Sequence, residues 1–169
     1  MGDGHSSIYY STTMQDADGS FWTTDRDVFL ELAGASEIFE WFGFVPSFHD
    51  ATMNGLEISN GSAALSLNVF RMTDQVNAQG YFILDRHALI TLHLDGVTGV
   101  FLKGDANSTV FELGIRRLQT NAITWDTVAG PRPGDWEVRW ESAYGLEGAL
   151  YTRALKLALQ PTGQDAASA

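Results

Sequence analysis

Cysteine is absent from this chain of 169 residues. The chain therefore has no disulfide bonds and no thiolate chemistry, and this composition favours a reducing compartment. Long apolar runs are absent too, since none approaches the ~18 residues that a membrane-spanning helix needs. The first seven residues, Met-Gly-Asp-Gly-His-Ser-Ser, lack the basic start and the apolar middle of a secretory signal. These absences predict a cytoplasmic protein that does not associate with a membrane.

Basic residues are almost missing from the first third of the chain. Residues 1–60 carry ten acids and one base, Arg26, whereas residues 61–169 carry eleven acids and nine bases. The net charge of −11 is therefore concentrated near the N-terminus. Such a chain lacks the Lys and Arg that nucleic acid requires, and it would attract a basic protein partner instead. The alternative interpretation is that the acidic residues only keep the protein soluble.

Motifs for common catalytic and cofactor chemistry are also missing. The chain has no G-x-S-x-G, no H-E-x-x-H and no glycine-rich phosphate loop. Residues 16–19, Asp-Ala-Asp-Gly, lack the flanking ligands of a calcium loop and predict an ordinary turn. We therefore expect no cofactor, no bound metal and a protein that is not an enzyme.

Two short helices are predicted near the N-terminus. Residues 24–34 have helical spacing, with Val28, Phe29 and Leu32 on one face and Gly34 as a credible end.

The second helix is predicted over residues 37–42. Ser36 would cap this helix and Gly43 would end it, while Glu37 and Glu40 suit the positive end of its dipole.

After residue 51 the apolar period changes from helical to alternating. Asn60-Gly61 separates two alternating runs, which is the strongest local signal for a β-hairpin. Residues 86–94 alternate with Ala88, Ile90, Leu92 and Leu94 on one face, and Asp95-Gly96 predicts a second hairpin into residues 97–103. Between the two hairpins, the pattern predicts a polar loop at 72–80 and a brief strand at 81–84. After the second hairpin, it predicts a strand or helix at 109–118 and a strand around Trp136, Val138 and Trp140. A last hairpin is predicted from 144–148 into 149–159.

The fold class that follows is α+β and mainly β. One or two short N-terminal helices would pack on a twisted antiparallel sheet of about seven or eight strands, shaped as a half-barrel or sandwich. We expect residues 1–20 to form a flexible or edge segment, residues 21–161 a single globular domain, and residues 162–169 a frayed tail. The oligomeric state does not follow from the sequence.

The densest chemistry lies in residues 41–51, Trp-Phe-Gly-Phe-Val-Pro-Ser-Phe-His-Asp-Ala. This stretch joins the helices to the sheet, and it contains the pair His49-Asp50. One interpretation is structural, because an imidazole and a carboxylate can satisfy backbone groups that Pro46 leaves unpaired. The other is functional, with Ser47, His49 and Asp50 in a binding site or a cleft.

Metal binding by the histidines is disfavoured by distance. His87 and His93 share a strand face, but six residues of strand separate them by about 20 Å. Ser47, His49 and Asp50 have the composition of a catalytic triad, yet consecutive residues do not converge easily as a triad does. Both uses would need a further group from elsewhere in the fold.

The stretch Pro46-Ser47-Phe48-His49-Asp50-Ala51 resembles the immunity protein 50 family of bacterial polymorphic toxin systems. Members read much like F-G-x-W-P-S-F-H-D-A at this place, and here Val45 stands where tryptophan is expected. The resemblance is tight over residues 42–51 and loose over 36–118. It implies a non-enzymatic immunity protein that binds and blocks a cognate toxin.

The expected function is therefore association with a protein partner, in which an acidic surface meets a basic toxin domain. The binding residues we expect are Trp41, Ser47, His49, Asp50, Glu37 and Glu40. The alternative is a small-ligand-binding protein or hydrolase with a cleft around His49-Asp50.

Overall fold

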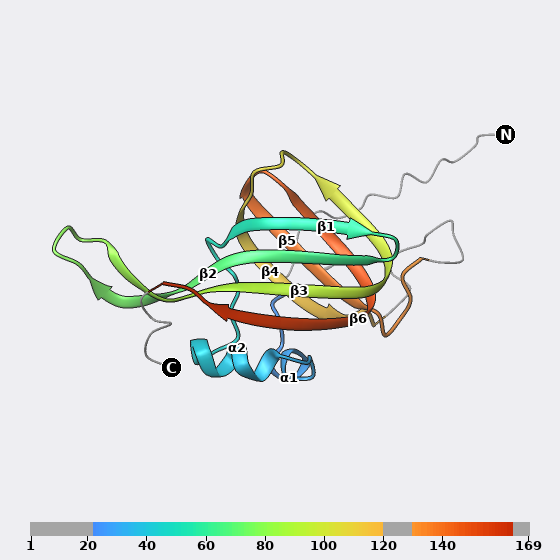
Figure 1. The fold of residues 1–169 in the computed structure, drawn as a ribbon, viewed down its shortest axis with the longest axis horizontal. Helices are drawn as coiled ribbons and strands as arrows, with labels where there is room; N and C mark the ends of the chain where they lie inside the picture. Colours follow the sequence, from blue (N-terminus) through green and yellow to red (C-terminus); the bar gives the residue numbers. More distant parts are fainter. Residues whose placement is uncertain (1–21, 120–129, 164–169) are drawn as a thin grey trace.

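The computed structural model describes residues 22–119 and 130–163. Its strands form one antiparallel sheet that closes into a barrel in the order β1-β2-β3-β6-β5-β4 (Figure 1). The elements are α1 (Arg26–Leu30), α2 (Ala35–Phe42), β1 (Thr52–Ser59), β2 (Ser62–Val76), β3 (Phe82–Lys103), β4 (Thr109–Arg117), β5 (Trp136–Tyr144) and β6 (Glu147–Pro161).

The prediction of a mainly β protein with two short helices and an antiparallel sheet is confirmed. The described residues contain six strands instead of seven or eight, and the sheet is a closed barrel instead of a half-barrel or sandwich. The segment 1–20 and the tail beyond residue 163 lie outside the described residues. Among the described helices, none has the length and apolar character to cross a membrane.

The Asn60-Gly61 hairpin is confirmed. Ser59 pairs with Ser62, and the two residues between them have φ angles of 42° and 84°. Positive φ at both turn positions matches the right-handed twist of the flanking strands, which explains the preference for this dipeptide.

The second predicted hairpin, at Asp95-Gly96, is wrong. Strand β3 passes through both residues, because β6 pairs with it on either side of this point, from Ala88 to Lys103. The ladder with β2 ends at Asp95, and Gly96 has a φ of 68°, so the dipeptide bends the strand. A glycine bend of this kind turns a strand from one wall of a barrel into the next.

Alternate residues of β2 and β3 fill much of the barrel interior. The apolar face expected on β3 is confirmed, because Ile90 and Leu92 are fully buried. They belong to a single core cluster that also contains Leu65 and Leu67 from β2 and Trp140 from β5. Each fully buried side chain of this size contributes about 1.5–3 kcal/mol of burial free energy.

Helix α1 is shorter than the 24–34 segment that the pattern indicates. It begins after Asp25, whose Oδ1 accepts hydrogen bonds from the backbone N–H of Asp27 and Val28. It ends at Leu30 because the chain then turns to pair with β6, where Leu157 N donates to Ala33 O at 2.8 Å. The helix thus gives way to backbone pairing on an open strand edge.

Helix α2 begins at Ala35, so the prediction that Ser36 caps a helix starting at residue 37 is wrong. Gly34 occupies the cap with a φ of 87°, and no side chain bonds to the first turn. A Cβ on Gly34 would lie 2.0 Å from the carbonyl oxygen of Leu157, so only glycine fits there. Gly43 ends the helix as predicted, with a φ of 83°.

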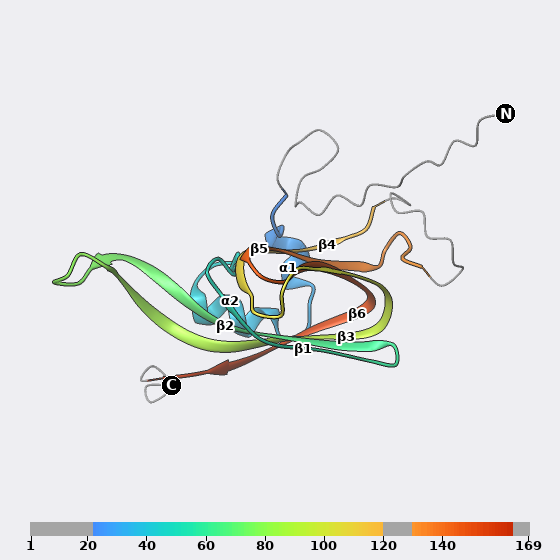
Figure 2. The same cartoon turned by 90° about the horizontal axis from the view of Figure 1, so that it is seen from above.

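A long hairpin projects from the barrel on the side away from the β1–β2 turn (Figures 1 and 2). We call residues 70–87 the arm. The prediction of a polar loop over 72–80 is wrong, because β2 continues to Val76 and β3 already begins at Phe82. The side chain of Asn77 accepts hydrogen bonds from Gln79 N and Tyr81 N, and so organises the short turn between them.

Candidate functional site

The stretch between α2 and β1 closes the barrel. Within the named strands, β1 meets β4 only at Thr52 and Thr109. The backbone before β1 continues this contact: Leu113 N donates to Ser47 O at 2.9 Å, and Asp50 N donates to Val110 O at 3.0 Å. We call residues 47–53 and 108–113 the seam, since their pairing joins the first strand of the barrel to β4.

Two residues of the seam have an unusual backbone. Phe48 and Asp50 both have a φ of 60°, a left-handed conformation that non-glycine residues rarely adopt. The turn places the Phe48 side chain in the core, where it is 2% exposed. The same turn leaves the neighbouring side chains of Ser47, His49 and Asp50 outside, in solvent.

His49 is fixed through one ring nitrogen only. Its Nδ1 lies 2.6 Å from the carbonyl oxygen of Phe111, and its ring meets the Phe111 ring edge-on at 5.3 Å between centroids. Since a carbonyl only accepts, Nδ1 carries the proton in this contact. The Asp50 Oδ2 atom lies 3.6 Å from Nε2, and both side chains are about half exposed.

Trp41 is placed against the root of the arm. Its indole N–H donates to the carbonyl oxygen of Arg86 at 3.0 Å, and the Arg86 guanidinium lies 5.0 Å from the ring centroid. Arg86 has a φ of 51°, at the point where the register between β2 and β3 shifts. Trp41, which is half-buried, therefore contacts the bulge at the point where the arm leaves the barrel.

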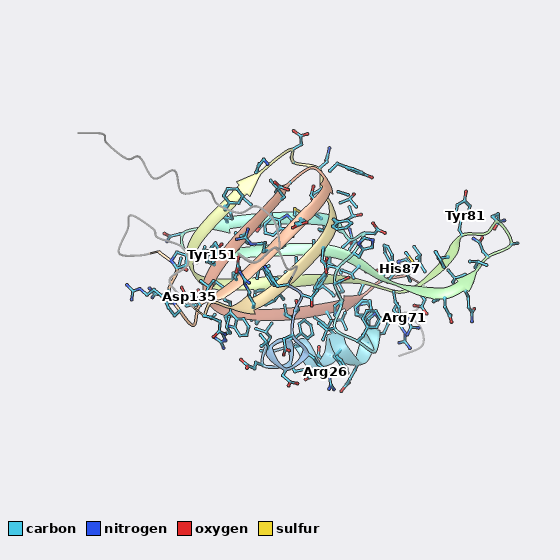
Figure 3. The ribbon with its side chains drawn as sticks, turned by 180° about the vertical axis from the view of Figure 1, so that it is seen from behind. Arg26, Arg71, Tyr81, His87, Asp135 and Tyr151 are labelled. Carbon is cyan, nitrogen blue, oxygen red and sulfur yellow. The ribbon has the colours of Figure 1, made fainter. Side chains whose placement is uncertain are left out.

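The outward face of the two helices is acidic. The side chains of Asp27, Glu37 and Glu40 are exposed and form no ion pair within the described residues. Glu31 lies 3.5 Å from Arg117, and Arg26 stacks on Phe39 at 5.0 Å. Figure 3 shows Arg26 on this helical end, away from the arm. The surface therefore presents negative charge with little local compensation.

The six expected binding residues thus fall into three neighbouring places. Glu37 and Glu40 lie on the helical face, Trp41 at the arm root, and Ser47, His49 and Asp50 on the seam. No hydrogen bond or ion pair joins the helical pair to the seam residues in the described chain.

A depression of about 430 Å³ lies elsewhere, at the β1–β2 turn end of the sheet. His93, Asp95 and Lys156 line it, but His49 and Asp50 do not. His87 contacts the Phe70 ring instead, at 6.0 Å. No cluster of three potential metal ligands occurs within residues 22–119 and 130–163.

One polar cluster escaped the sequence interpretation. The Glu137 carboxylate is 1% exposed and accepts from Arg116 Nε at 2.7 Å and Arg139 Nε at 2.8 Å. The Tyr151 hydroxyl lies 3.2 Å from the same carboxylate. Burial, followed by the Glu137 charge, raises the pKa of Tyr151 above its ordinary value. In the sequence, the only sign of this cluster is that Trp136, Val138 and Trp140 alternate with charged residues. Such alternation usually indicates that the charged side chains face solvent.

Comparisons with known proteins identify no relative of this chain. A scan against protein-family models, a search of curated proteins and a search of solved structures each find no match to this chain.

Proposed function

We propose that the chain is an immunity-type binding protein of the bacterial cytoplasm, without enzymatic activity of its own. It would neutralise a cognate toxin by direct association through the acidic face of α1 and α2. The observation that carries the proposal is the set of exposed carboxylates at Asp27, Glu37 and Glu40, which have no ion-pair partner within the described residues. The resemblance of residues 42–51 to immunity protein 50 supplies the class of partner.

The physical argument concerns encounter rate. An acidic face that meets a basic toxin domain accelerates association, and salt screens this attraction over a Debye length of about 8 Å at physiological ionic strength. The helical face is suited to such a role because its acids lie outward on rigid elements whose apolar sides are anchored in the barrel core. The toxin would be a basic domain, such as a nuclease.

The test is co-expression of the chain with the toxin encoded beside its gene, followed by binding measurements on the purified pair. We expect rescue of growth, and an association rate that falls roughly tenfold in the Glu37→Gln/Glu40→Gln variant. The control variant Glu57→Gln/Asp105→Asn removes the same charge away from the helices and should leave the rate nearly unchanged. Growth that is not rescued would refute the function, and equal losses in both variants would refute the surface.

A second candidate function rests on His49. Its Nδ1 is held by a carbonyl, which is how a histidine is commonly oriented as a base or ligand, and Nε2 lies 3.6 Å from Oδ2 of the half-exposed Asp50. The strained backbone at Phe48 and Asp50 also occurs often at functional sites. Hydrolysis of simple nitrophenyl esters or phosphates that is lost in His49→Ala but retained in His93→Ala would support a hydrolase. Equal rates in the two variants would remove this candidate.

A further inference from the structure

The arm carries an apolar face that no described residue covers. Met72 pairs with Leu84 and Val76 pairs with Phe82, so these four side chains project from the same side of the ribbon. They are 48%, 39%, 56% and 55% exposed, respectively. Figure 3 shows Tyr81 far out on the arm, and this ring is 71% exposed. Exposed apolar surface of this kind usually marks an interaction site.

The opposite side of the arm carries Ile83 and several polar groups that are bonded to one another. Arg71 forms two hydrogen bonds with Asp85, Nε to Oδ1 at 2.8 Å and Nη2 to Oδ2 at 2.6 Å. Thr73 Oγ1 donates to the carbonyl oxygen of Ile83 at 2.9 Å. The bidentate bond with Arg71 lowers the pKa of Asp85. Together with Trp41 at the root, these contacts tie the two strands of the arm to each other and the arm to the barrel.

Both edges of the arm are free of further strands within the described chain. The pairing of β1 with β2 stops at Asn68, and the pairing of β3 with β6 starts at Ala88. A two-stranded ribbon with open edges and an apolar face is marginal on its own in water. Two identical ribbons related by a two-fold axis can stack with the same apolar face toward each other, which is a self-complementary contact.

The charge of the arm suits contact with a second copy of this chain. Residues 70–87 contain two acids, Asp74 and Asp85, and two arginines, Arg71 and Arg86, so the arm has no net charge with histidine neutral. The whole chain has a net charge of −11, and two copies therefore repel one another over most of their surfaces. The arm projects away from the acidic helices, so it is the place where two copies can meet with the least repulsion.

We propose that the arm is a self-association element, through which the apolar faces of two copies pack together about a two-fold axis. The contact buries Met72, Val76, Phe82 and Leu84 of each copy. It does not depend on the proposed function, because the acidic helical face stays outside it. Self-association has the opposite salt dependence from toxin binding: added salt screens the repulsion between the acidic bodies and tightens the pair.

The test is sedimentation velocity on the full chain, from micromolar to near-millimolar concentration, at low and high salt. We expect a concentration-dependent dimer that is favoured by salt. Leu84→Ser with Phe82→Ser should raise the dimer Kd at least ~10-fold. The single variants Leu84→Ser and Ile83→Ser are a matched pair, since both residues are 39% exposed and they point to opposite sides of the ribbon. We expect only Leu84→Ser to weaken the dimer.

A single cysteine gives a second measurement, because the chain has none of its own. Under mild oxidation, Met72→Cys should form a disulfide between copies much faster than Phe44→Cys, whose site is 45% exposed outside the arm. A chain that stays monomeric at every concentration overturns the proposal. So does a dimer that Leu84→Ser and Ile83→Ser weaken equally. Binding of a monomer to neutral phospholipid vesicles, or to the toxin, that depends on Leu84 would assign the arm to another occupant and overturn it as well.

Discussion

Two regions depart from the usual burial of side chains in opposite directions. One is the wall, the part of the sheet formed by β4, β5 and β6, and the other is the arm at residues 70–87. The wall buries the charged Glu137, whereas the arm exposes the apolar Phe82 and Leu84. In the wall, the buried carboxylate has arginine partners within hydrogen-bonding distance, so the departure is compensated inside the chain. In the arm, no described residue compensates it, and we infer that the compensation comes from outside.

The largest effect that this comparison predicts is the loss of the buried carboxylate. Glu137→Ala removes the carboxylate that balances the charge of Arg139, whose side chain is 11% exposed, and we expect it to lower the free energy of unfolding by about 3–5 kcal/mol. On the arm, Asp85→Ala breaks an ion pair that is about one-third exposed, and we expect less than about 1 kcal/mol. Urea denaturation of both variants measures the contrast. Similar losses would show that the wall and the arm do not differ in this way.

The glycine that packs on the wall, Gly34 at the start of α2, should tolerate substitution less well than Gly80 on the arm. Gly34 and Gly80 have φ angles of 87° and 84°, but a Cβ on Gly34 would meet the Leu157 carbonyl and one on Gly80 would meet nothing within 4 Å. Gly80→Ala should therefore cost only the conformational penalty, about 1–2 kcal/mol. We expect Gly34→Ala to exceed this by about 1–3 kcal/mol. Thermal unfolding of the two proteins gives the difference, and equal melting temperatures would contradict it.

High pH should act on the wall and spare the arm. The pKa of Tyr151 is raised by burial and by Glu137, so the folded chain keeps the phenolic proton that the unfolded chain loses above about pH 10. The stabilising contribution is thus complete below that pH and decreases as the pH rises further. We expect the urea midpoint to fall as the pH rises above about 10, by a smaller amount in Tyr151→Phe. Tyr81→Phe, on the exposed arm tip, should follow the unaltered chain.

The smallest effect on folding is expected on the arm face itself. Phe82→Ser and Leu84→Ser remove apolar groups that are already 55% and 39% exposed, and we expect changes within about 0.5 kcal/mol at concentrations where the chain is monomeric. A loss of several kcal/mol would mean that these side chains pack within their own copy, which would erase the distinction between arm and wall.

Local patterns were sufficient for elements whose partners are close in sequence. Asn60-Gly61 specifies its own turn, and the alternation along β3 is enough to identify Ile90 and Leu92 as core residues. Asp95-Gly96 carries the same local signal as a hairpin. It forms a bend because β6, distant in the sequence, pairs with both halves of β3. The register with a distant strand is decided by the whole sheet, which local periodicity does not contain.

The candidate site was predicted in composition and only partly in arrangement. The sequence indicated that residues 41–51 join the helices to the sheet, and they do so. Their pairing with β4 depends on the left-handed backbone at Phe48 and Asp50. Aspartate is enriched in this conformation, but no sequence preference suggests it for phenylalanine. The burial of Glu137 was equally invisible, because its stabilising partners come from two other strands and from its own strand neighbour Arg139.

The seam has a consequence for how the barrel opens locally. It is held by a few backbone hydrogen bonds, whereas the ladder between β3 and β6 runs from Ala88 to Lys103. Opening the seam exposes the barrel interior while the long ladders stay intact, so it should require much less free energy than global unfolding. The amide protons of Val110 and Leu113 would then exchange with deuterium well before those of Ile90 and Leu92. The same stretch that joins the helices to the sheet would thus be the first line along which the native barrel parts.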